Sequence, residues 1–339
     1  MKNKQLISVL LGLLLIAALV AACATPTAAP TEPPAQAPAE EPAAPAETTA
    51  RPYIPVISKG FQHQFWQAVR LGSENAARDL NVDITFEGPE SESQVDRQIE
   101  MLQVALEKNP SAICLAALDS QAVIPLLERA QAAGIPVIGF DSGVDSDIPV
   151  TTAATDNIAA AAHAADKMAE LIGGEGEVAV IVHDQTSRTG IDRRDGFVNR
   201  MAEQYPNITV VDVQYGGGDH LRSTELARAI IQAHPNLKGF FGANEGSIIG
   251  VLNAVRELDM EGDLVVIGYD SGQQQMDAIR SGAEAGAITQ DPIGIGYKCV
   301  EAAVKAINGE SQPDTIDTGF HWYDATNIDS DEIAPLLYE

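Results

Sequence analysis

Short apolar runs alternate with longer amphipathic stretches along most of this chain. The apolar runs lack an apolar–polar alternation, which is typical of strands buried on both faces of a parallel sheet. They predict strands at residues 53–57, 82–86, 112–115, 135–140, 177–182, 208–213, 239–241, 264–269 and 285–289. Apolar residues at helical spacing predict helices at residues 62–80, 93–108, 121–133, 156–172, 190–205, 219–233, 247–258, 273–280 and 293–308. This alternation indicates right-handed βαβ units and parallel sheets.

The globular part of the chain is longer than one usual domain. Its roughly 285 residues suit two lobes of about 140 residues each. A short repeat supports this division, because Phe140-Asp141 and Tyr269-Asp270 each end an apolar run and are each followed by Ser-Gly. We therefore predict an α/β protein with two doubly wound parallel-sheet lobes that face each other.

Polar side chains stand at the ends of three predicted strands. Asp141, Asn244 and Asp270 each close an apolar run. In open α/β sheets, ligands bind outside the carboxyl ends of the strands. The sequence therefore predicts a site for a polar, uncharged ligand at these strand ends.

Aromatic and basic residues extend this candidate site. Phe65 and Trp66 open the first helix, where neighbouring side chains point about 100° apart, so that one can face the crevice. For either residue alone, the alternative is a place in the core. Arg193 follows the strand at residues 177–182; its alternative role is pairing with acidic neighbours at a solvated helix start. An aromatic face suits a sugar ring, and charged groups suit its hydroxyls.

The N-terminal segment predicts export and lipid anchoring. Two lysines precede an apolar stretch, residues 6–20, that is short for a bilayer span. Cys23 follows a pair of small residues, as at a lipoprotein cleavage site. We predict a signal peptide at residues 1–22 and a lipid on Cys23, with a secretory signal or a transmembrane anchor as the alternative. Residues 23–51 are rich in Ala, Pro, Thr and Glu and predict a disordered tether.

The formal net charge of −27 is spread along the body of the chain. An acidic surface argues against nucleic acid or an anionic membrane as a partner of the body, and it disfavours an anionic ligand. Cys114 and Cys299 lack the spacing of a metal or redox motif, so we expect buried free thiols there. A bridge between them, as an exported protein can form, is the alternative.

Enzyme motifs are absent from the sequence. It contains no Gly-x-Ser-x-Gly, Walker or His-Glu-x-x-His pattern, and its six histidines show no metal spacing. The glycines of residues 173–176 predict a helix-to-strand turn. Those of residues 216–218 could cradle a phosphate, but Asp219 favours a turn with a helix cap. We expect no catalytic residue, no metal and no cofactor.

These features together resemble the ribose-binding-protein group of periplasmic sugar-binding proteins, the receptors of ABC importers. The resemblance runs from Pro52 to near the C-terminus. Its markers are Ser58 with Phe65-Trp66, Asp119-Ser120, Phe140-Asp141-Ser142, Asp156-Asn157, Arg193 with Gly196-Phe197, Ala243-Asn244-Glu245, Gly268-Tyr269-Asp270 and Ile288-Thr289-Gln290. It implies one lobe of residues 52–154 with 291–319 and another of residues 155–290 with 320–339, joined by a three-crossing hinge.

The resemblance also implies which residues contact the ligand. Hydroxyl contacts are expected from Asp141, Arg193, Asn244, Asp270 and Gln290, and ring stacking from Phe65 and Trp66. A second group of candidates comprises Ser58, Gln62, His63, Ser142 and Tyr269.

The chain departs from the ribose-specific members at several positions. Ser142 replaces an arginine, Gly218 a phenylalanine and Ala116 an asparagine, and the loop after Ser58 is one residue longer. The loss of one aromatic and one arginine predicts a wider pocket, which favours a hexose such as glucose or galactose and leaves a pentose possible.

The function predicted from the sequence is sugar capture for import. We expect a monomeric lipoprotein, anchored to a bacterial membrane with its body outside the cytoplasm, that closes on a monosaccharide and presents the closed form to an ABC permease complex. A sensor serving a chemoreceptor or kinase is an alternative. A sugar-acting enzyme is a weaker one, since no nucleophile–base pair is found. The export signal and the missing DNA-binding helix pair exclude a repressor. Substitution of Asp270 by alanine is predicted to abolish binding and to leave the fold intact.

Overall fold

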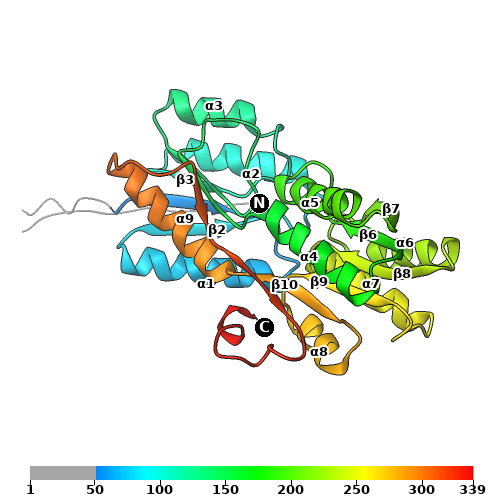
Figure 1. Cartoon of the computed structure of the whole chain (residues 1–339). Coiled ribbons are helices and arrows are strands. Elements are labelled where there is room, and N and C mark those ends of the chain that lie inside the picture. The colour runs from blue at the N-terminus through cyan, green and yellow to red at the C-terminus, as the bar shows by residue number, and fades with distance from the viewer. Residues whose placement is uncertain (1–50, 339) are drawn as a thin grey trace, which may run out of the picture. The chain divides into compact units, whose positions relative to one another are not determined.

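The computed structural model describes residues 51–338, which form two six-stranded sheets with helices on both faces of each (Figure 1). The strand orders are β11-β5-β4-β3-β1-β2 and β12-β10-β9-β8-β6-β7. Every neighbouring pair is parallel except β10 and β12, which are antiparallel. The predicted fold class, two doubly wound parallel-sheet lobes, is confirmed.

The first lobe is built on the sheet that contains β1. Its strands are β1 (Tyr53–Ile57), β2 (Asp83–Glu87), β3 (Ile113–Leu115), β4 (Val137–Phe140), β5 (Thr151–Ala154) and β11 (Thr315–Asp317). Its helices are α1 (Gln64–Asp79), α2 (Val95–Glu107), α3 (Ile124–Ala132) and α9 (Pro292–Ile307). Successive side chains of a strand point to opposite faces. Cys114 therefore packs in the core under α1 and α9, while Ile113 and Leu115 pack in the core under α2 and α3.

The second lobe repeats this plan. Its strands are β6 (Gly176–Val182), β7 (Ile208–Tyr215), β8 (Leu237–Gly242), β9 (Val265–Tyr269), β10 (Gly286–Gln290) and β12 (Phe320–Tyr323). Its helices are α4 (Asn157–Leu171), α5 (Arg188–Gln204), α6 (His220–Ala233), α7 (Glu245–Glu257) and α8 (Gln273–Ser281). Val180 lies in the core with α4 and α5, and Ile181 lies in the core with α6 and α7. Both faces of β6 are thus buried, as its unbroken apolar run predicts.

The chain passes between the two sheets three times: after β5, after β10, and between β11 and β12. Strands β5, β11 and β12 were not predicted from the sequence. Their residues do not form apolar runs, and β11 is largely exposed at the sheet edge. Pairing with neighbouring strands, not their own composition, makes them strands. A short 3₁₀ helix, Ala334–Leu336, lies near the end of the chain.

Local sequence signals place several element boundaries. The Asp156 carboxylate accepts a hydrogen bond from the Ala159 N–H and caps α4, as predicted. The Asp219 carboxylate caps α6 in the same way through the Arg222 N–H, so residues 216–219 form a turn with a helix cap. The glycines of residues 173–176 connect α4 to β6, which confirms the predicted helix-to-strand turn.

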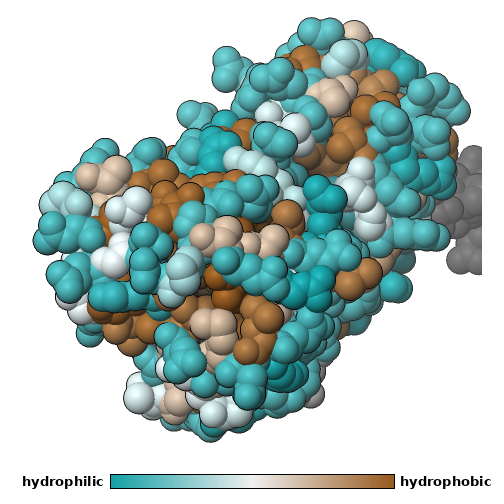
Figure 2. Space-filling view, turned by 90° about the vertical axis from the view of Figure 1, so that its right-hand side faces the viewer, coloured by the Kyte–Doolittle hydropathy of each residue, from teal (hydrophilic) through white to brown (hydrophobic). Residues whose placement is uncertain are grey.

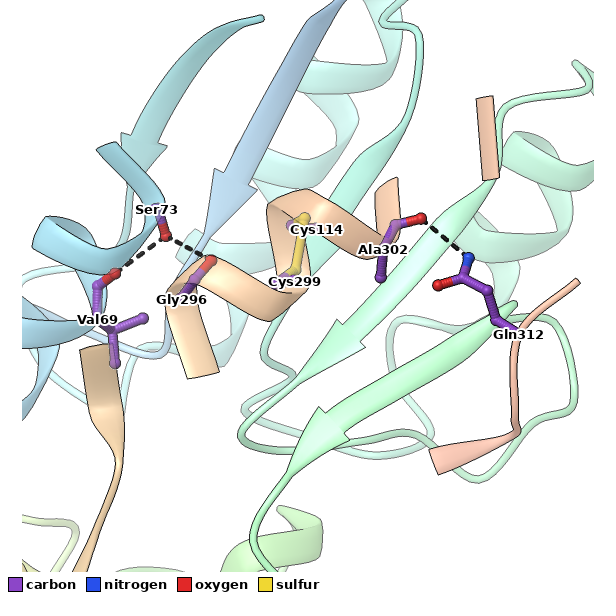
Figure 3. Close-up of a disulfide and its surroundings, with 7 residues drawn as sticks. All are labelled: Val69, Ser73, Cys114, Gly296, Cys299, Ala302 and Gln312. Atoms are coloured by element: carbon purple, nitrogen blue, oxygen red, sulfur yellow. Dashed lines mark hydrogen bonds between the residues drawn. A yellow bond between two sulfur atoms is a disulfide. The ribbon is translucent and has the colours of Figure 1, made fainter. Parts of the chain in front are cut away.

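Cys114 of β3 and Cys299 of α9 form a disulfide (Figure 3), with their Cα atoms 6.4 Å apart. The expectation of free thiols is therefore wrong. Because α9 returns to the first sheet and packs across β3, it brings together cysteines that are 185 residues apart in sequence. The spacing of the two cysteines in the sequence does not indicate that they are close in space. Next to the disulfide, Ser73 of α1 donates to the carbonyl oxygens of Val69 and Gly296, which ties α1 to α9 (Figure 3).

The predicted signal peptide, lipid site at Cys23 and most of the tether lie outside the described residues. Within residues 51–338, no helix is long and apolar enough to cross a bilayer. The same residues hold no cluster of His, Cys, Asp and Glu suited to a metal ion. On the face shown in Figure 2, hydrophobic side chains form patches separated by hydrophilic ones. The most exposed large hydrophobic residues of the described part are Leu71, Val104, Val150, Ile158, Leu171, Leu221 and Ile293.

Candidate functional site

A small cavity lies between the carboxyl ends of the two sheets. Its lining residues are Lys59, His63, Phe65, Trp66, Glu92, Asp141, His183, Thr189, Arg193, Asn244, Asp270 and Gln290. All seven residues of the first predicted group are among them.

Asp141 and Asp270 occupy equivalent places in the two lobes. Each directly follows a strand, and each has a positive φ, 54° and 80° respectively. The N–H of each donates to a carbonyl oxygen of the next strand, from Asp141 to Ala153 and from Asp270 to Ile288. Asp tolerates this left-handed conformation better than most residues, and such strain is often found at functional sites. The repeat seen in the sequence is therefore a repeated turn that aims one carboxylate from each lobe at the cavity.

The Asp270 carboxylate is the centre of a buried network. It accepts hydrogen bonds from the Glu245 N–H at 2.9 Å and from the Gln290 Nε2 at 2.8 Å. Arg193 Nη1 lies 3.9 Å from its Oδ2. The network fixes the three cavity-facing groups relative to one another. Oε1 of Gln290 is buried and has no hydrogen-bond partner among the described residues.

Arg193 is buried, so the alternative of a solvated helix start is wrong. Its Nε donates to Asn157 Oδ1 at 2.7 Å and its Nη1 to the Ala243 carbonyl at 2.9 Å. The guanidinium also lies over the Tyr269 ring, with Cζ 3.7 Å from the ring centroid. These contacts hold the charged group at the cavity wall and support its burial.

Phe65 and Trp66 form the aromatic part of the lining. Their rings pack edge to face, with centroids 5.0 Å apart. Both side chains belong to the buried core of the first lobe, and both also line the cavity. The two alternatives, a place in the core and a place at the crevice, therefore both apply. The Trp66 Nε1–H donates to Glu92 Oε1 at 2.8 Å, which fixes the plane of the indole.

Only one residue of the second predicted group lines the cavity. His63 lines the cavity, but Ser58, Gln62, Ser142 and Tyr269 do not. The Ser58 hydroxyl donates to backbone carbonyls of its own lobe, and Gln62 Oε1 accepts from the Glu92 N–H. The ring of Tyr269 packs against the guanidinium of Arg193 and does not itself line the cavity.

The sequence profile of the periplasmic binding protein domain matches residues 54–311. The chain belongs to the periplasmic binding protein family. Among curated relatives, the D-allose-binding periplasmic protein of Escherichia coli K12 is 26% identical over 259 residues, 74% of this chain and 83% of the relative. The ribose import binding protein RbsB of Bacillus subtilis 168 is 24% identical over 252 residues, 74% of this chain and 80% of the relative.

Solved structures give the same picture. A carbohydrate transporter solute-binding protein from Agrobacterium radiobacter, in complex with D-arabinose, is 30% identical with a TM-score of 0.83. The match covers 86% of this chain and 100% of that chain. An ABC transporter solute-binding protein from Agrobacterium vitis with bound D-fucose is 31% identical with a TM-score of 0.82, covering 84% and 100% of the two chains.

Four lining residues of this periplasmic binding protein were missed: Lys59, Glu92, His183 and Thr189. His183 directly follows β6 and Lys59 lies two residues beyond β1, so the strand-end rule that found Asp141 also applies to them. Glu92 lies in the connection between β2 and α2, and Thr189 lies in the first turn of α5. Neither position has a local pattern that marks it.

Gly218 borders polar side chains of the first lobe. A Cβ atom added to Gly218 would lie 3.1 Å from Glu92 Oε2, 3.2 Å from His63 Nε2 and 3.4 Å from Gln62 Nε2. Polar side chains of the first lobe therefore fill the space that a larger residue would take.

Charge in the cavity is mixed. Lys59 and Arg193 face the carboxylates of Glu92, Asp141 and Asp270. Burial raises the pKa of Asp141 to about 6, against the opposing effect of the two cations.

Burial also affects His183. Together with the nearby cations, it holds the pKa of His183 well below its usual value, so this imidazole is neutral at pH 7.

The lobes contact each other around the cavity. Lys59 Nζ, in the first lobe, donates to Thr189 Oγ1 at 3.1 Å and Ser187 Oγ at 3.3 Å in the second. The Ser120 N–H donates to the Thr186 carbonyl at 2.9 Å, and Thr186 Oγ1 donates to the Leu118 carbonyl at 3.1 Å. The structure is thus a closed form, in which the cavity is bounded by both lobes.

Proposed function

We propose that this protein is the substrate-binding component of a sugar ABC importer and binds a neutral monosaccharide between its lobes. One observation carries the proposal: an aromatic pair and a ring of buried carboxylate, carboxamide and guanidinium groups converge from both lobes on one small cavity. An aromatic face suits the C–H face of a sugar ring, and the polar groups suit its hydroxyls. The names of the relatives, which bind D-allose, D-arabinose and D-fucose, support this ligand class.

The proposed roles follow the geometry. Asp141, Arg193, Asn244, Asp270 and Gln290 bond the sugar hydroxyls, and the aromatics stack on the ring. Asn244 uses its Oδ1 to cap α7 through the Ser247 N–H, which holds its amide in place. Ionised carboxylates in the lining disfavour an anionic ligand.

Binding and closure are coupled in this proposal. Phe65, Trp66 and Asp141 belong to the first lobe, whereas Arg193 and Asn244 belong to the second. A ligand that bonds both groups at once binds the closed form better, and it shifts the population towards that form. The permease complex then recognises the closed surface.

The finer proposals concern the sugar and the setting. A hexose such as glucose is favoured over a pentose, supported by relatives whose structures hold the six-carbon sugars D-tagatose and D-fucose. The protein acts as a monomer, outside the cytoplasm, anchored through a lipid on Cys23.

A thermal-shift screen of neutral monosaccharides tests the function. A ligand that binds only the folded state raises its stability, by about 2.7 kcal/mol at a hundred times its Kd. We expect at least one neutral hexose or pentose to raise the Tm, with calorimetry giving one site per chain. Stabilisation only by amino acids, nucleosides or anions would show that the sugar proposal is wrong.

A further inference from the structure

Glu92 is a buried acid, and only one of its two carboxylate oxygens is hydrogen-bonded within the described residues. Its side chain is only 6% exposed, and it lines the cavity. Oε1 accepts the Trp66 Nε1–H at 2.8 Å, whereas Oε2 has no hydrogen-bond partner within residues 51–338. A buried acceptor without a partner is unfavourable, and more so when it is charged. A group in the cavity that donates to Oε2 would remove this cost.

Contacts from both lobes hold Glu92 in this place. Its backbone N–H donates to Gln62 Oε1 at 3.0 Å, within the first lobe. From the second lobe, Gly218 packs against it, and a Cβ there would lie 3.1 Å from Oε2. Gly218 has a φ of +67°, a conformation that suits glycine. The contacts within the first lobe hold the carboxylate in place before closure, which limits the ordering that binding must pay for. Gly218 packs against it when the lobes close.

The charge of Glu92 defines the ligand atom that can face it. Burial acts to raise the pKa of Glu92, but Lys59 and the Trp66 hydrogen bond are among the interactions that bring it below its usual value. The group is ionised at neutral pH, so Oε2 can only accept. Its partner must donate, which excludes a carboxylate or phosphate oxygen.

His63 adds a second requirement. Its ring is buried, and Nε2 lies 3.8 Å from Glu92 Oε1. Neither ring nitrogen has a hydrogen-bond partner in the part of the chain that the structure describes. An imidazole ring carries at least one N–H donor. A ligand hydroxyl can donate to Glu92 and accept from His63 at the same time, whereas an ammonium group can only donate.

We propose that Glu92 and His63 form a hydroxyl-binding subsite of the cavity, in which Glu92 Oε2 accepts a hydrogen bond from one hydroxyl of the bound sugar and thereby determines which sugars are selected. This inference rests on the proposed sugar-binding function. In this proposal the two carboxylate oxygens of Glu92 have different roles. One accepts the hydrogen bond that positions the indole of Trp66, and the other accepts a hydrogen bond from the ligand.

The variant Glu92→Gln separates the two roles. The amide oxygen of glutamine still accepts the Trp66 N–H, but its nitrogen cannot accept a hydroxyl. Glu90→Gln, at an exposed position of the same connection, is the matched control. The probes are D-allose, D-ribose, D-arabinose, D-tagatose and D-fucose, followed by the monodeoxy analogues of the tightest binder. For that binder we expect Glu92→Gln to weaken binding about 10- to 100-fold in calorimetry and Glu90→Gln to leave it unchanged.

The monodeoxy analogues make the test specific. In the wild-type protein, loss of the hydroxyl that faces Glu92 costs about 10- to 100-fold; in Glu92→Gln the same loss costs less than about twofold. Loss of any other hydroxyl costs the same in both proteins. A crystal structure of the wild-type complex, needed if the variant does not fold, should show a sugar oxygen within hydrogen-bond distance of Oε2.

The possible failures are distinguishable. If no neutral monosaccharide binds the wild-type protein, the proposed function fails, and the subsite fails with it. If a sugar binds but Glu92→Gln keeps full affinity, only the subsite is refuted. The same holds if every deoxy analogue loses equally in both proteins, or if no sugar oxygen lies near Oε2.

Discussion

The Glu245 carboxylate, in the first turn of α7, accepts a hydrogen bond from the Phe65 N–H at 3.2 Å, in the first turn of α1. Its other oxygen accepts from the Gln64 N–H at 3.1 Å. The first N–H groups of a helix have no partner within it, and His63 at the N-cap of α1 provides no side-chain cap. A residue of the second lobe therefore caps a helix of the first, next to the aromatic pair.

Substitution Glu245→Gln should favour opening. The bonds between Glu245 and α1 exist only when the lobes are closed, and glutamine retains one acceptor of the two. We expect ligand affinity to fall about tenfold, which corresponds to about 1.4 kcal/mol. Spin labels on the two lobes should report a longer interlobe distance in the ligand-free variant, with Glu225→Gln, exposed on α6, as the control. Unchanged distances and affinity would rule out this capping role.

Replacing Asp270 should affect both stability and binding. Alanine would leave two buried donors, the Glu245 N–H and Gln290 Nε2, without an acceptor. The structure thus revises the expectation that Asp270→Ala leaves the fold intact: we expect a loss of at least about 2 kcal/mol in the free energy of unfolding. Asp270→Asn keeps one acceptor and should lose less stability while still losing sugar affinity. Urea unfolding and calorimetry measure the two effects, and equal stability of both variants and the wild type would contradict this network.

Sugar affinity should depend on pH through Asp141. Its pKa is raised to about 6 by burial, with Glu92 and Asp270 adding to the effect and Lys59 and Arg193 opposing it. A hydroxyl donated to the carboxylate favours the ionised form, so affinity should rise from pH 5 to 7, by at most about tenfold per pH unit. In the ligand-free protein, stability contributed by Asp141 is present when the group is protonated and is lost as the pH rises through 6.

Calorimetry in buffers of different ionisation enthalpy measures this linkage. Near pH 5.5, binding should release protons, and Asp141→Asn should remove both the proton release and this part of the pH dependence. Constant affinity of the wild-type protein from pH 5 to 7 would refute a donated hydroxyl at Asp141.

The disulfide should stabilise the first lobe. Replacing Cys114 and Cys299 together by serine should lower the free energy of unfolding by about 2–4 kcal/mol. Peptide mapping of the oxidised wild-type protein should recover the two cysteine peptides as one linked species, which reduction separates. Two peptides that are both alkylated without reduction would contradict the bridge.

The sequence predicted what local composition controls. Strand β1 follows from an unbroken apolar run, and Asp156 marks the start of α4 because a carboxylate satisfies free N–H groups there. Strands β5 and β11 escaped prediction because pairing with neighbours defines them. The carboxylates at strand ends were found by the topology of parallel sheets. Glu92 was missed because the connection between β2 and α2, not a periodic element, brings it to the cavity.

The path of the chain also orders its assembly. The core of the first lobe needs Ile295, Cys299 and Val300 from α9, although its first strands begin the globular part. During synthesis, every strand from β6 to β10 is made before α9. The second lobe can therefore build most of its sheet while the first still lacks a helix, reversing the usual tendency of N-terminal domains to fold first. The Cys114–Cys299 bond can form only after α9 has been made and has packed against β3. Its formation therefore marks the late completion of the first lobe, although that lobe's strands are made first.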